Sequence, residues 1–200
     1  MDSLPEGRIR LLHIEAGSGD QPILCWLSRE VLAELPSYEA LSYTWGEPEK
    51  NRVIICDGSP LGVSQNLYET LKYLRKSDQE RSVWIDAICI RQEDEEEKTQ
   101  QVRIMKEIYK RAAHVVIWLG QEAPEDKVAF DLLYRFEEAW DKFGENLDFG
   151  PYQFAFYDYN LPDIHAKDWW ALVKFFQKPW FSRIWILQEV KISLFHKRSY

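Results

Sequence analysis

The sequence is poor in cysteine, and this limits the classes of protein it can belong to. It contains three cysteines in 200 residues, Cys25, Cys56 and Cys89, which are 31 and 33 positions apart. This number and spacing indicate neither a disulfide framework nor a metal knuckle. All three lie in apolar runs, which favours buried, inert thiols over reactive ones.

Features of membrane and nucleic-acid-binding proteins are also missing. No stretch approaches the roughly 20 apolar residues of a membrane span, and residues 1–6 lack a basic and apolar leader. Acidic residues outnumber basic ones by 33 to 25, and the net charge of −8 argues against a nucleic-acid or anionic-membrane surface. We therefore expect a soluble cytoplasmic protein without a nucleic-acid partner.

Motifs for phosphate and metal binding are absent as well. There is no glycine-rich loop of the Walker or Rossmann type. The four histidines, His13, His114, His165 and His196, show no spacing with cysteines or acids that is typical of a triad or a zinc site. The acidic run at residues 93–97 is interpreted as the solvated start of a helix. We expect no metal and no resident cofactor.

What the sequence does contain predicts a packed α/β domain. Hydrophobic residues make up 46% of the chain and include nine tryptophans, enough for a substantial core. Alternating patterns and turn residues predict strands, and Ser64 is placed to cap a helix. The expected elements of the first half are strands at 8–14 and 22–27, a short helix at 28–35, a strand at 38–45, a hairpin at 52–63 and a helix after Ser64.

The block at residues 84–120 is the most specific part of the chain. Residues 82–90 read as a buried strand interrupted by Asp86, and Asp94 is placed to cap the following helix, with Glu97 closing a capping box. A second buried strand is expected from His114 to Leu119. A strand, a helix and a second strand imply a right-handed crossover and a parallel sheet.

The sequence after Gly120 predicts a helical insertion within one domain. Helices are expected at 125–143 and 166–176, separated by an aromatic stretch rich in glycine and proline. We expect an N-terminal hairpin extension (1–37), a core domain (38–190) with the insertion at 121–180, and a tail (191–200).

Three separated blocks resemble the fungal heterokaryon incompatibility (HET) domain, in the same order. They are Tyr38–Gly46, the block at 84–120 and Arg183–Glu189, so that the resemblance covers about residues 38–189. It implies a role in non-self recognition and programmed cell death. It also implies a distant relationship to the Toll/interleukin-1 receptor (TIR) domain, a flavodoxin-like, mainly parallel sheet with helices on both faces.

The TIR resemblance implies a candidate site at the carboxyl ends of the strands, where ligands of such sheets bind. Trp185 and Glu189 are four residues apart and would share a helix face, as in TIR domains that hydrolyse NAD, where the glutamate acts on the ribose. Glu189 is therefore the candidate catalytic residue and NAD the candidate substrate. The candidate substrate-binding residues are Ser42, Tyr43, Trp45, Gly46, Asp86, Arg91, Gln92, Arg183 and Trp185.

Some of these residues have a functional role implied by the resemblance, and others also have a structural alternative. Tyr43 or Trp45 would stack on a planar ring, and Arg183 would meet a phosphate. Asp86 needs a partner because burying a lone carboxylate is costly, and a structural hydrogen bond would serve equally well. Arg91 stands where the family pattern has asparagine, which either improves phosphate binding or marks a degenerate site. Trp185 and Glu189 would otherwise be a core residue and an exposed residue.

Three hypotheses about function follow from the sequence. The first is a cell-death effector that hydrolyses NAD, in an active form that is a homo-oligomer. The second is a non-catalytic module that self-associates or recruits other incompatibility proteins. The third is an inactive fragment, because the sequence stops eleven residues after Glu189.

Overall fold

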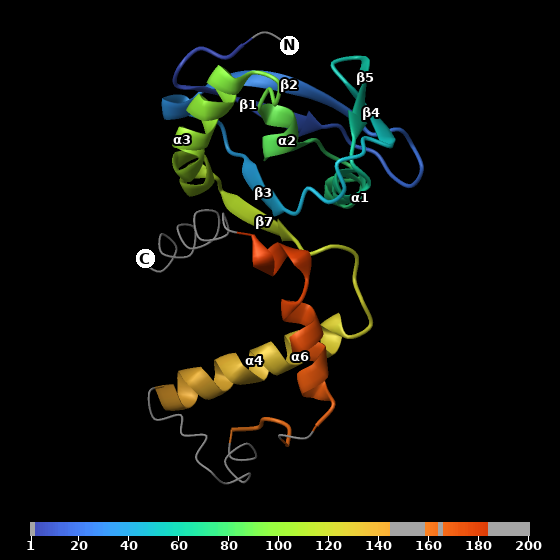
Figure 1. The fold of residues 1–200 in the computed structure, drawn as a ribbon, viewed down its shortest axis with the longest axis vertical. Coiled ribbons are helices and arrows are strands. Elements are labelled where there is room, and N and C mark those ends of the chain that lie inside the picture. The colour runs from blue at the N-terminus through green and yellow to red at the C-terminus, as the bar shows by residue number, and fades with distance from the viewer. Residues whose placement is uncertain (1–2, 145–158, 164–165, 184–200) are drawn as a thin grey trace. The chain divides into compact units, whose positions relative to one another are not determined.

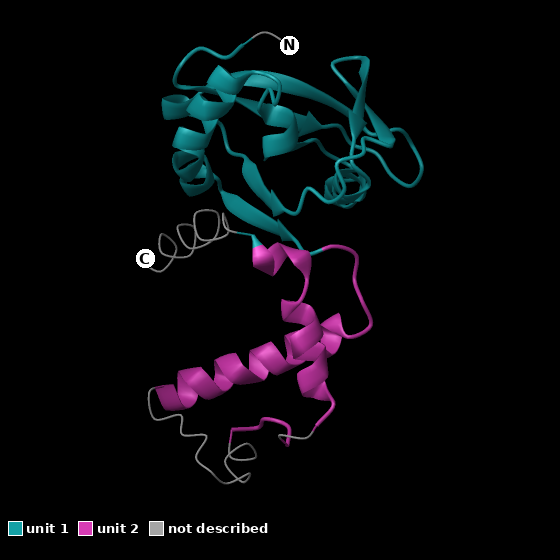
Figure 2. Cartoon of the chain, in the orientation of Figure 1, with its two compact units in different colours: residues 1–119, 183–200 teal, residues 120–182 magenta. Residues whose placement is uncertain are grey.

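The computed structural model describes residues 3–144, 159–163 and 166–183, and the chain divides into two compact units (Figure 2). Unit 1 comprises residues 1–119 together with the chain from Arg183, and unit 2 comprises residues 120–182. The sheet labelled in Figure 1 lies in unit 1, which is teal in Figure 2.

Among its described residues, unit 1 has one seven-stranded sheet and three helices. The strands follow the order β5-β4-β2-β1-β6-β3-β7. The strands are β1 (Arg8–Ile14), β2 (Leu24–Val31), β3 (Glu39–Tyr43), β4 (Arg52–Cys56), β5 (Ser59–Val63), β6 (Arg81–Trp84) and β7 (His114–Trp118). The helices are α1 (Gln65–Leu74), α2 (Asp86–Cys89) and α3 (Glu95–Arg111), with a 3-10 turn η1 at Leu32–Glu34.

The α/β class expected from the sequence is confirmed, but the sheet is mixed rather than mainly parallel. β1 pairs antiparallel with both β2 and β6, and β4 pairs antiparallel with β5. β2 and β4 are parallel, and β3 is parallel to both β6 and β7. The expected parallel crossover from β6 to β7 is therefore present, with β3 inserted between the two strands.

Local sequence patterns explain most elements of unit 1. From Ile9 to Ile14 every residue of β1 is buried, because this strand lies in the middle of the sheet. In α1 the residues that face the core recur at helical spacing, and the Ser64 side chain caps its first turn by accepting from the Leu67 amide at 3.3 Å. Both hairpins and the capped helix were predicted correctly.

Two predicted elements were wrong. The strand expected at 82–90 ends at Trp84, and Asp86 begins the short helix α2, where its Oδ1 accepts from the Ala87 amide at 2.7 Å. An aspartate at the start of a helix can accept a hydrogen bond from a backbone amide of the first turn, and this favours a helix over a strand at that position. The helix expected at 28–35 is reduced to the 3-10 turn η1 at Leu32–Glu34, because β2 continues to Val31, where it pairs with Arg8 of β1.

The capping box predicted for α3 is only half formed. The Asp94 side chain accepts from the Glu97 amide at 3.1 Å as expected. The Glu97 carboxylate, however, forms a buried ion pair with Arg10 of β1, at 2.5 and 3.0 Å. It also accepts from the backbone amides of Leu4, at 3.0 Å, and Arg91, at 2.8 Å.

These contacts determine the charge of Glu97. Burial by itself would raise the pKa of this carboxyl, but the hydrogen bonds from Arg10 and from the two amides outweigh it and lower the pKa to about 2. Glu97 is therefore ionised and neutralises a cation inside the fold.

The described part of unit 2 contains two packed helices, α4 (Asp126–Phe143) and α6 (Asp168–Phe176), followed by the 3-10 turn η3 (Pro179–Ser182). Phe130 and Phe175 meet edge to face with ring centroids 5.1 Å apart, and Lys178 pairs with Asp126 at 2.6 Å. Among the helices described in both units, none is long and apolar enough to cross a membrane.

Candidate functional site

The site forms where the loop after β3 meets the start of α2. The Trp45 indole Nε1–H donates to Asp86 Oδ2 at 2.9 Å. This bond joins two segments that are 41 residues apart in the sequence. It supplies the partner that Asp86 was expected to need, and it fixes the plane of the Trp45 ring.

Helix α1 holds the other side of the same loop. Ser64 Oγ–H donates to the Trp45 carbonyl at 3.0 Å, and the Asn66 side-chain amide donates to the Thr44 carbonyl. Asn66 also accepts from the indole of Trp118 at 3.1 Å. Gly46 adopts a φ of +73°, and a Cβ there would lie 3.2 Å from the Cβ of Asn66, so glycine suits this turn.

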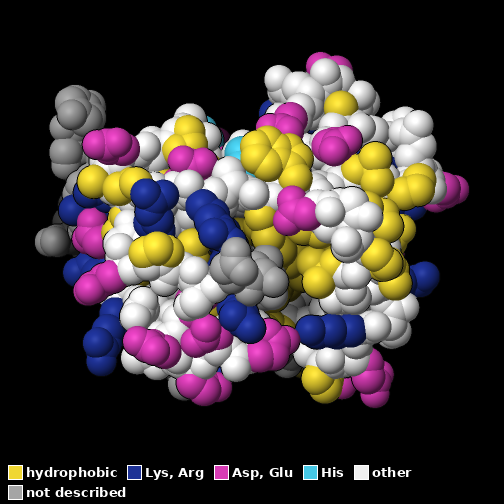
Figure 3. Space-filling view, turned by 90° about the horizontal axis from the view of Figure 1, so that it is seen from above, with side chains coloured by type: hydrophobic (Ala, Val, Ile, Leu, Met, Phe, Trp, Pro, Cys, Tyr) yellow, Lys and Arg dark blue, Asp and Glu magenta, His cyan; other side chains and the backbone are white. Residues whose placement is uncertain are grey.

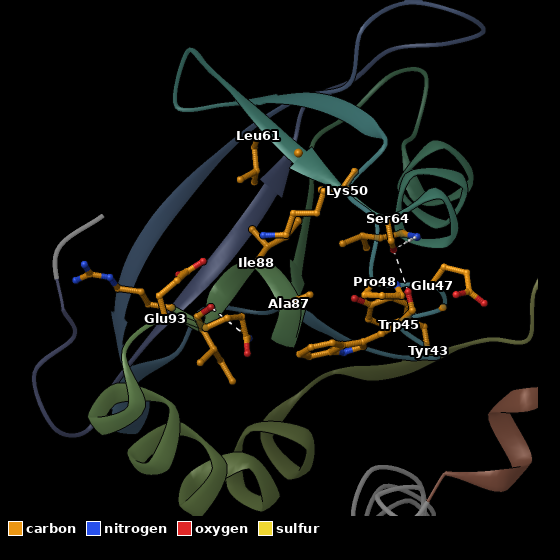
Figure 4. A pocket seen from close by; sticks show the side chains of 17 residues that line it. Tyr43, Trp45, Glu47, Pro48, Lys50, Leu61, Ser64, Ala87, Ile88 and Glu93 are labelled. Atoms are coloured by element: carbon orange, nitrogen blue, oxygen red, sulfur yellow. Dashed lines mark hydrogen bonds between the residues drawn. The ribbon is translucent and has the colours of Figure 1, made fainter.

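A cavity of about 470 Å³ opens beside this turn, and we call it the Trp45 cavity. Leu61 of β5 points into the same space as Ala87 and Ile88 of α2, and Lys50 reaches over it (Figure 4). The face seen in Figure 3 has a hollow lined by hydrophobic side chains, with charged groups around it. The cavity is lined by Tyr43, Trp45, Gly46, Glu47, Pro48, Lys50, Leu61, Gly62, Val63, Ser64, Leu67, Ala87, Ile88, Ile90, Arg91, Gln92 and Glu93.

The lining combines an apolar wall with charges of both signs. Aliphatic side chains of β5, α1 and α2 form the wall, while two cations, Lys50 and Arg91, and two acids, Glu47 and Glu93, are also part of it. This size and composition match sites for small organic ligands, which are concave, mostly apolar and oriented by a few polar groups.

Glu97 holds one wall of the cavity. Its carboxylate accepts from the Arg91 amide, and the Gln92 side chain donates to the Asp86 carbonyl at 2.9 Å. Residues 91–93 are thus tied on one side to the buried ion pair and on the other to the start of α2. The position of the Arg91 side chain depends on both anchors.

A polar cluster lies at the end of β3, next to the cavity. Ser42 is fully buried, and its Oγ accepts from Nη1 of Arg183 at 3.3 Å. Tyr43 is buried too, and burial, together with the nearby Asp86 carboxylate, raises its pKa well above the usual value against the opposing effect of Arg183. Tyr43 is therefore a neutral hydrogen-bonding and stacking group.

The structure brings most of the sequence-derived candidates together. Tyr43, Trp45, Gly46, Arg91 and Gln92 line the cavity, and Asp86 contacts it through Trp45. Ser42 does not line it, because its side chain points into the fold toward Arg183.

Two of the candidate residues have no described position, and the cavity lining also includes residues that the sequence did not suggest. Trp185 and Glu189 lie outside the described residues. Lys50 and Leu61 were not anticipated, since nothing in their local sequence marks them as part of a site. In the described ranges, no group of three or more histidine, cysteine, aspartate or glutamate side chains is placed to hold a metal ion.

Fold and site together define an α/β domain with a ligand-sized cavity beside the carboxyl end of β3. The family model for the heterokaryon incompatibility protein (HET) matches residues 38–189, and the chain belongs to this family. It is 30% identical over 221 aligned positions to "Heterokaryon incompatibility protein 6, OR allele" of Neurospora crassa. That match covers 92% of the chain and 32% of the relative, so the chain spans about a third of the relative's length. No solved structure matches it.

Proposed function

We propose that this domain acts in fungal heterokaryon incompatibility and that it does so by hydrolysing NAD at the Trp45 cavity. Membership of the HET family and the name of the Neurospora relative support the biological role. The observation that carries the chemical proposal is that two distant segments, 43–47 and 86–93, meet at one mostly apolar cavity at the end of β3.

The chemistry of the lining suits a nucleotide with a planar ring. The ring would pack between the aliphatic wall and Trp45, whose edge is held by Asp86. Lys50 and Arg91 supply two cations for a pyrophosphate. A charge-assisted hydrogen bond of this kind contributes about 1.5–3 kcal/mol.

In the proposed reaction the bond between nicotinamide and ribose breaks and nicotinamide leaves with the electron pair. The Glu189 carboxylate stabilises the oxocarbenium ion that develops on the ribose. Water then adds to the ribose carbon and gives up a proton. This role of Glu189 is proposed from the resemblance to TIR domains.

The test measures nicotinamide release from NAD by the purified chain, at several protein concentrations so that an oligomeric active form is detected. We expect wild type to release nicotinamide and Glu189→Gln to release none, while both show the same circular dichroism spectrum. Glu107→Gln, at a half-exposed position on α3, is the matched control and keeps wild-type activity. Equal release by Glu189→Gln, or none by wild type at any concentration, would refute the proposal.

Binding is tested separately by calorimetry with NAD. Arg91→Ala is expected to weaken binding by about 10- to 100-fold, corresponding to the loss of one charge-assisted contact. Arg103→Ala, on the exposed side of α3, should bind as wild type does. If both variants bind equally well, the cavity is not the NAD site.

A second candidate function is recruitment of partners through unit 2. The side chains of Tyr134, Trp140 and Trp170 are all more than half exposed, an unusual density of large aromatic groups on one small helical unit. If cells expressing Glu189→Gln still die without loss of NAD, while Trp140→Ser with Trp170→Ser prevents death, this function replaces hydrolysis.

A further inference from the structure

Two of the three buried cysteines lie side by side in the sheet. β2 and β4 pair in parallel over two positions, and one of these places Cys25 opposite Cys56. Residues opposite each other in a parallel pair point to the same face, and the strands are about 4.8 Å apart. That spacing lies within the roughly 4.4–6.8 Å between Cα atoms that a disulfide spans.

Several hydrogen bonds join the two strands around these cysteines. The Asp57 amide donates to the Cys25 carbonyl at 3.0 Å, and the Asp57 side chain accepts from the Leu27 amide at 3.1 Å. The Cys25 thiol donates to the Ile55 carbonyl at 3.2 Å. The two side chains are therefore held next to each other in the folded chain.

The two thiols also differ in reactivity. The interaction with Cys56, together with burial, raises the pKa of Cys25, and the interaction with Cys25 lowers the pKa of Cys56 despite its burial. Thiolate is the reactive form of cysteine, so Cys56 is the more nucleophilic of the pair.

Cys56 is 8% exposed, more than Cys25 or Cys89. It lines a second cavity, of about 490 Å³, which we call the Cys56 cavity. The same lining contains Arg29 and Asp57, and the Asp57 carboxylate acts against ionisation of Cys56. Cys89 provides the contrast, because it is fully buried and burial raises its pKa to about 12.

We propose that Cys25 and Cys56 form a redox-active dithiol that hydrogen peroxide oxidises to an intramolecular disulfide, which thiol reductants reverse. The Cys56 thiolate attacks the peroxide, its sulfur takes one oxygen, and the other oxygen leaves as water after protonation. The Cys25 sulfur then attacks the resulting sulfenic acid, the sulfur–sulfur bond forms, and the Cys25 proton leaves with the hydroxyl group as a second water. Two thiols lose two electrons and the peroxide gains them.

The disulfide would act on the wall of the Trp45 cavity. β4 and β5 form the hairpin that carries Leu61, Gly62 and Val63 of that wall, and within the described residues it joins the sheet through the short pairing of β4 with β2. A cross-link there would restrict the hairpin. In a reducing compartment such bonds are transient and serve as redox sensors.

The test uses the folded chain, oxidised with hydrogen peroxide, blocked with N-ethylmaleimide after unfolding and digested with trypsin without reduction. The three cysteines fall in separate peptides, 11–29, 53–72 and 82–91. We expect 11–29 linked to 53–72, free alkylated 82–91, and full reversal by a thiol reductant. Alkylation of all three cysteines, or a Cys56 sulfinic acid without the link, would overturn the proposal.

Variants and a structural readout complete the experiment. Cys25→Ser should trap the Cys56 sulfenic acid, detectable with dimedone, and Cys89→Ser should form the link at the wild-type rate. Amide exchange in β4 and β5 should slow by about tenfold or more in the oxidised chain. Unchanged amide exchange would disprove the effect on the hairpin. The peptide map of wild type shows whether the disulfide forms, even if a variant does not fold.

Discussion

Replacing Glu97 by glutamine should destabilise unit 1 strongly. The carboxylate accepts four hydrogen bonds, two from Arg10 and one each from the Leu4 and Arg91 amides, and its side chain is fully buried. The fall of its pKa from 4.5 to about 2 corresponds to about 3 kcal/mol of stabilisation of the ionised form. Breaking a buried pair by removing one partner costs about 3–5 kcal/mol, which agrees with this figure.

The assay is urea unfolding at pH 7, followed by circular dichroism. Glu96→Gln is the matched control, since it removes the same charge from the exposed side of the same helical turn, and it should change the free energy of unfolding by less than about 0.5 kcal/mol. We expect Glu97→Gln to lose about 3 kcal/mol. A loss below about 1 kcal/mol would show that the ion pair is not formed as described.

A double-mutant cycle separates the pair from the rest of the site. Arg10→Met alone leaves the Glu97 carboxylate buried without its cation, while Arg10→Met with Glu97→Gln leaves no buried charge of the pair. We therefore expect the double variant to be less destabilised than the sum of the two single ones. Additive losses would mean that the two residues act independently.

Three further predictions concern pH, the turn at the site and the cap of α1. Because the pKa of Glu97 is lowered, its stabilisation is present above about pH 4.5 and is lost as the pH falls toward 2, so the urea midpoint should drop over this range in wild type and less in Glu97→Gln. Gly46→Ala should lower stability by about 1–3 kcal/mol, and by more than Gly19→Ala, because both glycines have positive φ but only Gly46 faces another side chain, that of Asn66. Ser64→Ala should cost about 1 kcal/mol in thermal unfolding by loss of the cap.

Elements whose signals are local could be predicted from the sequence. The hairpin of β4 and β5 and the cap at Ser64 depend on residues close together in the chain, and their patterns were sufficient. The place of the N-terminal hairpin in the sheet could not be predicted, because pairing of β1 with β6 and of β2 with β4 depends on contacts between distant segments.

The residues of the site show the same difference between local signals, which the sequence reveals, and contacts between distant segments, which it does not. Trp45 and Arg91 were candidates because they lie in blocks that resemble a family, and both line the cavity. The role of Glu97 was misjudged, since its local context favours a capping box while its partner Arg10 lies 87 residues away. Lys50 lies just before the β4–β5 hairpin and Leu61 lies in it, and both line the cavity because β4 pairs with the distant strand β2, which no local pattern encodes.

The order of the strands has a consequence for recombinant work on this family. The family match begins at residue 38, after β1 and β2, yet these two strands lie between β4 and β6 in the sheet. A protein cut to the matched range would leave the β4–β5 hairpin and the β6-β3-β7 group as two separate pieces of sheet. Arg10, the buried counter-ion of Glu97, would be lost with them. The boundary drawn by sequence similarity therefore passes through the middle of a single folding unit.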